Sequence, residues 1–333
     1  MRICVVGAGA IGGMLAVRLA NCGHAVSLIL RGANLSAVRA NGMTLIEENG
    51  QELRMQPACA TASLAEAGPQ DLVILGMKAH QVAAVAPDLH HLLDAGTCIV
   101  TMQNGIPWWY FHKLAGPWQG TAVRAVDPDG SIAQHIPIER VIGSVVYPAS
   151  EVIRPGVVRV IEGNRFTLGE IDGSDTPRVR AISDAFKAAG FKAPVSADIR
   201  SEIWLKLWGN LSFNPISALT HATLEDICLF GPTRELAAGM MREAQAVGEQ
   251  LGVQFKVSLD KRIAGAQAVG QHKTSMLQDV EAGRPLELQA LVGAVIELGT
   301  ITGVPTPTIA AVHALASLLA QSLSLRGQGL RLA

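Results

Sequence analysis

The stretch that decides the fold is RICVVGAGAIGGMLAVRLA, residues 2–20. A short β-branched run ends at Gly7, and an apolar pattern with helical spacing follows and closes near Gly23. Gly7, Gly9 and Gly12 have GxGxxG spacing, and a second strand is expected at residues 24–30. This order of strand, glycine turn, helix and strand predicts a dinucleotide-binding unit.

The three glycines have different physical roles in such a turn. Gly7 permits the tight turn, Gly9 lets backbone N–H groups approach a pyrophosphate, and Gly12 lets the helix pack closely on the strand. The helix N-terminus then faces the phosphates. A glycine-rich turn without a ligand is the alternative. The residues predicted to bind the cofactor here are Gly7, Ala8, Gly9, Ala10, Ile11 and Gly12.

The end of the second strand indicates which dinucleotide binds. An NAD site usually carries an acidic residue there, which accepts the ribose hydroxyls. This strand ends with Arg31 instead, and a guanidinium suits a 2′-phosphate. The sequence therefore favours NADP over NAD, with a solvated arginine as the alternative.

Polar residues follow two further buried strands of the predicted parallel sheet. Residues 71–77 lead into Lys78, and residues 97–102 lead into Gln103 and Asn104. The carboxyl ends of parallel strands form the edge where ligands bind in open α/β sheets. We expect Lys78 and Asn104 at that edge, although both tips also fit ordinary loops.

The composition changes near residue 199. Before it, a hairpin is expected around Asn49 and Gly50, and later strands are expected to complete the sheet. After it only helical patterns follow. We therefore predict a Rossmann-type domain at residues 1–198 and an all-helical domain at residues 199–325. The later strands are expected at 141–146, 157–161 and 165–168, and the helices at 223–250, 258–268, 275–281, 287–302 and 308–322.

Residues 201–219, SEIWLKLWGNLSFNPISAL, place Lys206, Asn210 and Asn214 at four-residue spacing on one face of an apolar helix. A lysine between tryptophans is costly to desolvate unless it has a partner or a function. Pro215 is expected to kink or stop the helix and to leave Asn214 at the break. A snorkelling lysine with two surface amides is the structural alternative.

Two other positions have both structural and functional interpretations. Ser275, with Gln278 three residues later, fits a helix N-cap. Glu287 fits a solvated carboxylate near a helix start. The tryptophan-rich residues 106–118 fit either a helix over the cofactor site or a partner interface.

Composition excludes several classes of function. The formal net charge is −1 without a basic block, so a nucleic-acid partner is not expected. The five cysteines show no CxxC pairing, and no metal site or disulfide is expected. No secretion signal or membrane span is expected either, so we predict a cytoplasmic protein without a membrane partner.

Six motifs in order resemble the ketopantoate reductase (2-dehydropantoate 2-reductase) family over nearly the whole chain. They are GAGAIG at 7–12, Arg31, MKAHQ at 77–81, QNG at 103–105, IWLKLWGNLSFNPISAL at 203–219 and TSMLQD with GRPLEL at 274–288.

The resemblance implies a Rossmann-type domain followed by a helical domain like that of 6-phosphogluconate dehydrogenase. It implies reduction of ketopantoate with NADPH, a step toward pantothenate and coenzyme A, by an enzyme that forms a homodimer. The implied roles are Lys206 as general acid, Glu287 as the ligand of the substrate hydroxyl, Asn210, Asn214 and Ser275 as substrate ligands, and Lys78 and Asn104 beside the nicotinamide, with Asn104 also near the substrate.

Three alternatives stay open. One is a paralogue that reduces another 2-oxo acid. The second is a 3-hydroxyacid dehydrogenase, against which Arg31 argues. The third is a non-catalytic NADP-binding sensor, which leaves Lys206 and Glu287 without a common purpose.

Overall fold

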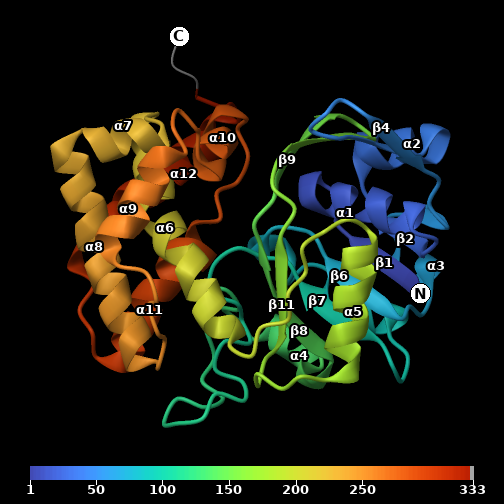
Figure 1. Cartoon of the computed structure of the whole chain (residues 1–333), viewed down its shortest axis with the longest axis horizontal. Helices are drawn as coiled ribbons and strands as arrows, with labels where there is room; N and C mark the ends of the chain where they lie inside the picture. The colour runs from blue at the N-terminus through green and yellow to red at the C-terminus, as the bar shows by residue number, and fades with distance from the viewer. Residues whose placement is uncertain (331–333) are drawn as a thin grey trace. The chain divides into compact units, whose positions relative to one another are not determined.

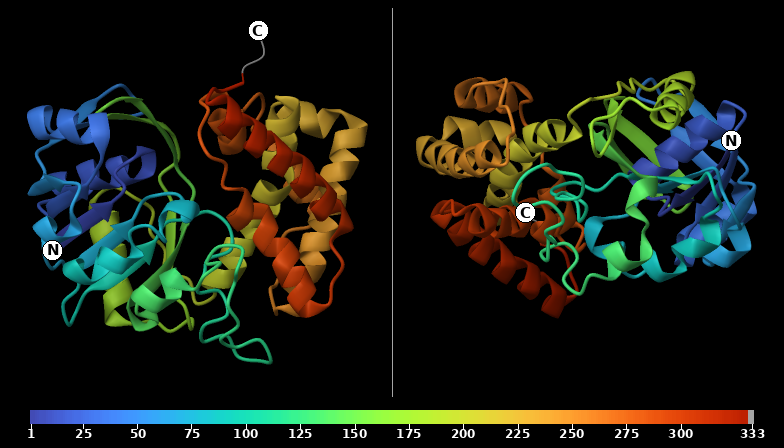
Figure 2. Two further views of the ribbon diagram at one scale, coloured as in Figure 1. Left: turned by 180° about the vertical axis from the view of Figure 1, so that it is seen from behind. Right: turned by 90° about the horizontal axis from the view of Figure 1, so that it is seen from below.

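The computed structural model describes residues 1–330 (Figures 1 and 2) and contains two compact units. The unit we call the sheet unit comprises Met1–Gln103, His112–Ala115 and Asp129–Ile199. The helical unit comprises Asn104–Phe111, Gly116–Pro128 and, of the described residues, 200–330. Two segments that precede residue 129 thus pack with the helices rather than with the sheet.

A seven-stranded sheet forms the centre of the sheet unit. All neighbouring strands are parallel except the pair at one edge, the first two in the order given next, which is antiparallel. In spatial order the strands are β11 (Phe166–Glu170), β8 (Val141–Val146), β7 (Cys98–Thr101), β6 (Leu72–Leu75), β1 (Arg2–Val6), β2 (Ala25–Ile29) and β5 (Cys59–Thr61). Because β1 lies between β2 and β6, the glycine turn after β1 emerges beside the ends of both neighbours.

A second sheet has four strands. In spatial order they are β4 (Glu52–Met55), β3 (Met43–Ile46), β10 (Val157–Glu162) and β9 (Ala149–Arg154). The predicted hairpin of β3 and β4 is confirmed. The expectation that residues 157–161 extend the main sheet is wrong, because β10 pairs in parallel with β3. A Cβ on Gly13 would lie 2.8 Å from Cγ2 of Val158, so this sheet covers the first helix closely.

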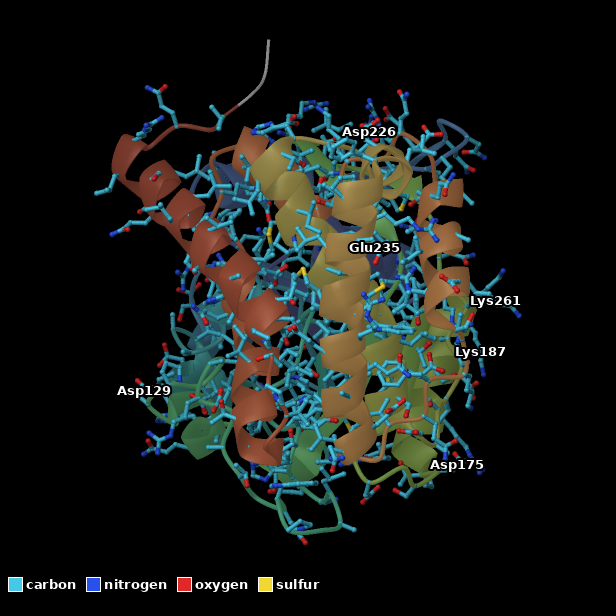
Figure 3. The ribbon with its side chains drawn as sticks, turned by 90° about the vertical axis from the view of Figure 1, so that its left-hand side faces the viewer. Asp129, Asp175, Lys187, Asp226, Glu235 and Lys261 are labelled. Atoms are coloured by element: carbon cyan, nitrogen blue, oxygen red, sulfur yellow. The ribbon has the colours of Figure 1, made fainter. Side chains whose placement is uncertain are left out.

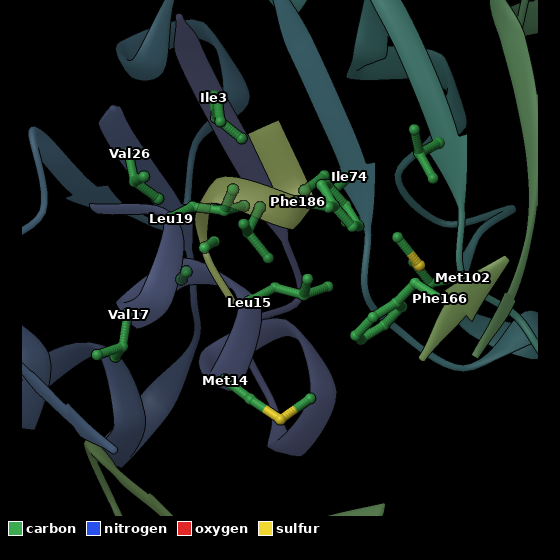
Figure 4. Close-up of a cluster of buried hydrophobic side chains, with 14 of the residues drawn as sticks. Ile3, Met14, Leu15, Val17, Leu19, Val26, Ile74, Met102, Phe166 and Phe186 are labelled. Carbon is green, nitrogen blue, oxygen red and sulfur yellow. The ribbon is translucent and has the colours of Figure 1, made fainter. Parts of the chain in front are cut away.

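The helices of the sheet unit pack on the main sheet through a continuous apolar core. Leu15, Leu19, Ile74, Phe166 and Phe186 lie together in it (Figure 4). This packing fixes the helix that starts at the glycine turn. The helices are α1 (Ala10–Asn21), α2 (Gly32–Asn41), α3 (Leu64–Ala67), α4 (Ser131–His135) and α5 (Pro177–Ala188), with 3₁₀ turns η1 (Ala79–Gln81), η2 (Ala86–Leu92) and η3 (Ile138–Arg140).

From Arg200 to Leu330 the structure contains helices and loops and no strand, as the sequence predicts. The predicted helix at 223–250 is two helices, because Gly231 and Pro232 start a new one. The elements are α6 (Ile199–Thr220), α7 (Leu224–Leu229), α8 (Gly231–Gln250), α9 (Leu259–Ala268), α10 (Ser275–Glu281), the π-helical turn η4 (Gln289–Gly293), α11 (Ala294–Thr302) and α12 (Pro307–Arg326).

Helix α6 runs through Pro215, so the expectation that the helix stops at this residue is wrong. The residues around the proline are buried, and the packing of this apolar helix outweighs the single hydrogen bond that proline cannot donate. Trp204 and Trp208 are fully buried and pack against Phe255. Trp208 also donates from Nε1 to the Met241 carbonyl over 2.7 Å, which ties α6 to α8.

The tryptophan-rich segment does not form the predicted helix, and its alternative role as a partner interface stays a prediction. Residues 106–111 make turns, and their aromatic side chains are buried in the helical unit. Nε1 of Trp204 donates to the Tyr110 hydroxyl over 2.7 Å, and Nε of Arg200 donates to the Tyr110 carbonyl over 2.8 Å. The segment therefore belongs to the core that supports α6.

Some helices of the helical unit carry charged side chains on their outer surface, whereas another is strongly apolar. Asp226, Glu235 and Lys261 project from α7, α8 and α9 (Figure 3). By length and composition alone, α12 is apolar enough to cross a membrane, so the expectation that no segment approaches a span is wrong for this helix. The same test is passed by helices of soluble proteins, and α12 packs against α8.

Candidate functional site

The glycine turn has the geometry that a dinucleotide phosphate requires. Gly7 has φ +89°, and a Cβ there would lie 2.9 Å from Cβ of Met77. A Cβ on Gly12 would lie 2.4 Å from the Gly7 carbonyl oxygen, whereas a Cβ on Gly9 would meet nothing within 4 Å. Gly7 and Gly12 are thus needed by the fold, while the space at Gly9, beside the N-terminus of α1, fits an approaching pyrophosphate.

Arg31 lies just beyond this turn. The Gly7 N–H donates to the Ile29 carbonyl over 3.1 Å. Nδ2 of Asn34 donates to the Ala8 carbonyl over 3.2 Å, while its Oδ1 accepts from the Gly156 N–H over 2.7 Å. Arg31 itself is exposed and extended at the start of α2. Asn34, which the sequence did not single out, ties the arginine's loop to the glycine turn.

The ends of β6 and β7 lie at the same edge of the sheet. The Gly76 N–H donates to the Val6 carbonyl over 2.9 Å, so the loop after β6 adjoins the glycine turn. Nε2 of Gln103 donates to the carbonyls of Leu75 and Met77 over 2.8 and 3.0 Å. Lys78 follows this pinned loop and lies in the sheet unit. Its role beside a nicotinamide stays a prediction.

The helical unit brings three predicted residues together. Nζ of Lys206 donates to Oδ1 of Asn104 over 2.6 Å, and Nδ2 of Asn104 lies 3.5 Å from Oε2 of Glu287. Lys206 comes from α6, Asn104 from the loop after β7, and Glu287 from the segment before η4. An amide thus joins an ammonium to a carboxylate, and all three groups belong to one unit.

The electrostatic setting of Lys206 favours proton donation near neutral pH. Burial lowers the pKa of Lys206 to about 8, and the negative charge of Glu287 opposes this shift by favouring the ammonium. A lysine with that pKa is mostly protonated at pH 7 and releases its proton more readily than an exposed lysine. This arrangement can stabilise a developing oxyanion and then protonate it.

The remaining predicted residues continue along α6. Asn210 is half-buried one turn after Lys206. Asn214 is buried, and its Nδ2 lies 3.5 Å from Oγ of Ser275. The predicted N-cap role of Ser275 is wrong, since Thr274 caps α10 by accepting from the Leu277 N–H. The exposed hydroxyl of Ser275 is therefore not used as the helix cap.

Comparison with known proteins gives matches over both units. The family model of the ketopantoate reductase PanE/ApbA matches residues 3–173, and that of its C-terminal part matches residues 198–320. A 2-dehydropantoate 2-reductase of Mesorhizobium japonicum is 56% identical over 321 residues, which is 96% of this chain and 98% of the relative.

Two solved structures are similar to this chain over nearly its whole length. A candidate ketopantoate reductase from Ralstonia solanacearum MolK2 has a TM-score of 0.92 at 41% identity and covers 98% of this chain and 99% of its own. The 2-dehydropantoate 2-reductase from Geobacter metallireducens GS-15 has a TM-score of 0.83 at 28% identity, covering 96% and 99% of the two chains. The predicted fold class, a Rossmann-type domain followed by a helical domain, is confirmed.

Proposed function

Because the chain belongs to the ketopantoate reductase PanE/ApbA family, we propose that it reduces 2-dehydropantoate (ketopantoate) to pantoate with NADPH. The observation that carries this proposal is the contact of Lys206 with Asn104, which also reaches Glu287. Residues 1–198 hold the dinucleotide, and residues 199–325 hold the substrate.

The chemistry follows from the charges. Bound NADPH would supply the hydride for the carbonyl carbon of the ketone. Lys206 stabilises the negative charge that develops on the carbonyl oxygen and gives that oxygen a proton, which leaves a neutral amine. Asn104 holds the ammonium in place, and Glu287 accepts a hydrogen bond from the substrate hydroxyl. Both groups thus orient the reacting ketone.

The other polar residues have binding roles in this proposal. Asn210, Asn214 and Ser275 hold the hydroxyl and carboxylate of the substrate, which is supported by the approach of Asn214 to Ser275. Arg31 pairs with the 2′-phosphate that distinguishes NADPH from NADH. Lys78 and Asn104 lie at the nicotinamide end of the cofactor. The dinucleotide phosphates lie along the turn from Gly7 to Gly12.

A steady-state assay with the purified chain tests this function. NADPH oxidation is followed with ketopantoate and with other 2-oxo acids. For each substrate, the rate with NADPH is compared with the rate with NADH. We expect the highest kcat/KM with ketopantoate and NADPH. A higher value for another 2-oxo acid would identify a paralogue. Faster oxidation of a 3-hydroxyacid, or NADPH binding without turnover of any substrate, would contradict the proposal.

We also propose a cytoplasmic homodimer whose partners are small molecules and which acts in pantothenate biosynthesis. The support for a second copy is the outer face of α12, where Leu315, Leu318 and Leu325 are 59%, 61% and 81% exposed. Such a face is unfavourable in water and suits burial against another apolar surface. Light scattering should give twice the mass of the chain for the wild-type protein and the mass of a single chain for the variant Leu318→Glu. A monomeric wild-type protein would exclude the dimer.

A further inference from the structure

The loop that carries Asn104 rests directly on the backbone of η4. Gly105 has φ +90°, and a Cβ on it would lie 2.2 Å from the carbonyl oxygen of Ala290 and 2.4 Å from its carbonyl carbon. The next N–H, that of Ile106, donates to the same Ala290 oxygen over 2.9 Å. Backbone meets backbone here, and only glycine allows this approach.

The carbonyl that this loop contacts belongs to the π turn η4. A π turn spaces its hydrogen bonds five residues apart and so interrupts the regular four-residue pattern of an α-helix. Here the Ala294 N–H donates to the Gln289 carbonyl, five residues back, and the Ala290 carbonyl accepts from the Ile106 N–H. Glu287 lies two residues before the turn, with its carbonyl bonded to the Leu291 N–H over 3.2 Å.

The turn therefore connects two members of the site. On one side its backbone fixes the position of Gly105, the neighbour of Asn104. On the other side it fixes the backbone of Glu287. Asn104 has to reach Nζ of Lys206 with one end of its amide and Glu287 with the other. A shift of about 1 Å in such an arrangement is enough to impair catalysis.

We propose that Gly105 is a positioning residue that, by docking on the Ala290 carbonyl of the π turn, holds the Asn104 amide between Lys206 and Glu287. This inference rests on the proposed reductase function, and it assigns a task to a residue that has no role in the chemistry described above.

The first test is the variant Gly105→Ala, with Gly120→Ala as its matched control. Gly120 also has a left-handed backbone, φ +76°, but a Cβ there would meet nothing within 4 Å. We expect Gly105→Ala to lower kcat/KM about 10- to 100-fold, the effect of losing a hydrogen bond to a charged group. The control's activity should change less than about twofold.

The pH profile separates positioning from a general loss of folded protein. The hydrogen bond that Lys206 donates to the Asn104 oxygen favours the charged form of the lysine. The negative charge of Glu287 favours the same form. In Gly105→Ala the alkaline limb of the kcat profile should move to lower pH by about half a unit or more. An unmoved limb with normal kcat would overturn the inference.

A double-mutant cycle tests whether Gly105 acts through Asn104. In the Asn104→Ala background, Gly105→Ala should have almost no further effect on kcat or on the pH profile, because the amide it positions is gone. Full additivity of the two losses would show that Gly105 acts by another route.

One measurement uses the unaltered protein and so does not depend on the variant folding. Amide hydrogen exchange of Ile106 should be slow, since its N–H is bonded to Ala290 inside the helical unit. Exchange as fast as in an open loop would show that the docking does not exist. Absence of any reductase activity would instead refute the proposed function while leaving this exchange result intact.

Discussion

The glycine turn and the Lys206 group are two sites built in opposite ways. The turn uses backbone atoms of consecutive residues, and what matters is where a Cβ is absent. The Lys206 group uses side chains. One of its hydrogen bonds joins two residues that are 102 positions apart in the chain, and the other joins two that are 183 positions apart. A local site depends on backbone conformation, whereas an assembled site depends on the packing of every element that carries one of its side chains.

The largest expected effect is at the assembled site. Lys206→Ala should lower kcat by about 10²- to 10⁴-fold, because one group both stabilises the oxyanion and donates the proton. Single-turnover reduction of ketopantoate measures this loss. The control is Lys261→Ala, which removes an exposed lysine of α9 and should leave kcat unchanged. Wild-type turnover in Lys206→Ala would remove this residue from the mechanism.

The next effect contrasts two glycines of the local site. Gly9→Ala should leave thermal unfolding nearly unchanged, since its Cβ meets nothing, yet weaken NADPH binding about tenfold or more by filling the phosphate space. Gly12→Ala should instead lower the free energy of unfolding by about 1–3 kcal/mol, because its Cβ overlaps the Gly7 carbonyl. Calorimetry of binding and of unfolding distinguishes them. Equal NADPH affinity of Gly9→Ala and wild type would show that no phosphate approaches there.

A smaller effect is expected at Arg31, where the local site recognises a charge. Arg31→Ala should weaken NADPH binding about tenfold through loss of an exposed charge-assisted contact, with little change for NADH. Fluorescence titration with both cofactors measures the ratio, and NADH is the internal control. Similar losses for both would mean that Arg31 does not contact the 2′-phosphate.

The smallest effect is a shift in pH dependence. The general acid must carry its proton, and the pKa of Lys206 is about 8, so reduction should be fastest below pH 8 and decline above it. Glu287 favours the ammonium, so Glu287→Gln should move this alkaline limb of the residual activity to lower pH. A limb that moves to higher pH would show that the carboxylate does not act on the lysine in this way.

Local patterns predicted the elements of the fold well. The β1–turn–α1–β2 order, the hairpin of β3 and β4 and the helix at residues 275–281 are all present. Predictions failed where packing overrides a local preference. Helix α6 continues through Pro215, and β10 joins a second sheet to cover α1. The aromatic residues 108–111 became part of the helical core, which no local pattern indicates.

The sequence singled out the candidate residues but not the hydrogen bonds between them. Motif order brought attention to Lys206, Asn104 and Glu287, and spacing put Asn210 and Asn214 on the face of α6 with Lys206. The sequence did not indicate that the single amide of Asn104 contacts both charged groups, nor that Gly105 docks on Ala290. The π turn was missed because its sequence fits an ordinary helix.

The sequence by itself determined the dinucleotide-binding turn and the identity of the charged residues, because glycine spacing and side-chain chemistry are properties of short segments. Only the tertiary structure decided which of these residues meet, that Thr274 rather than Ser275 caps α10, and that burial lowers the pKa of Lys206. Desolvation and hydrogen bonding between distant segments depend on how the chain packs, and that packing is a property of the whole helical unit.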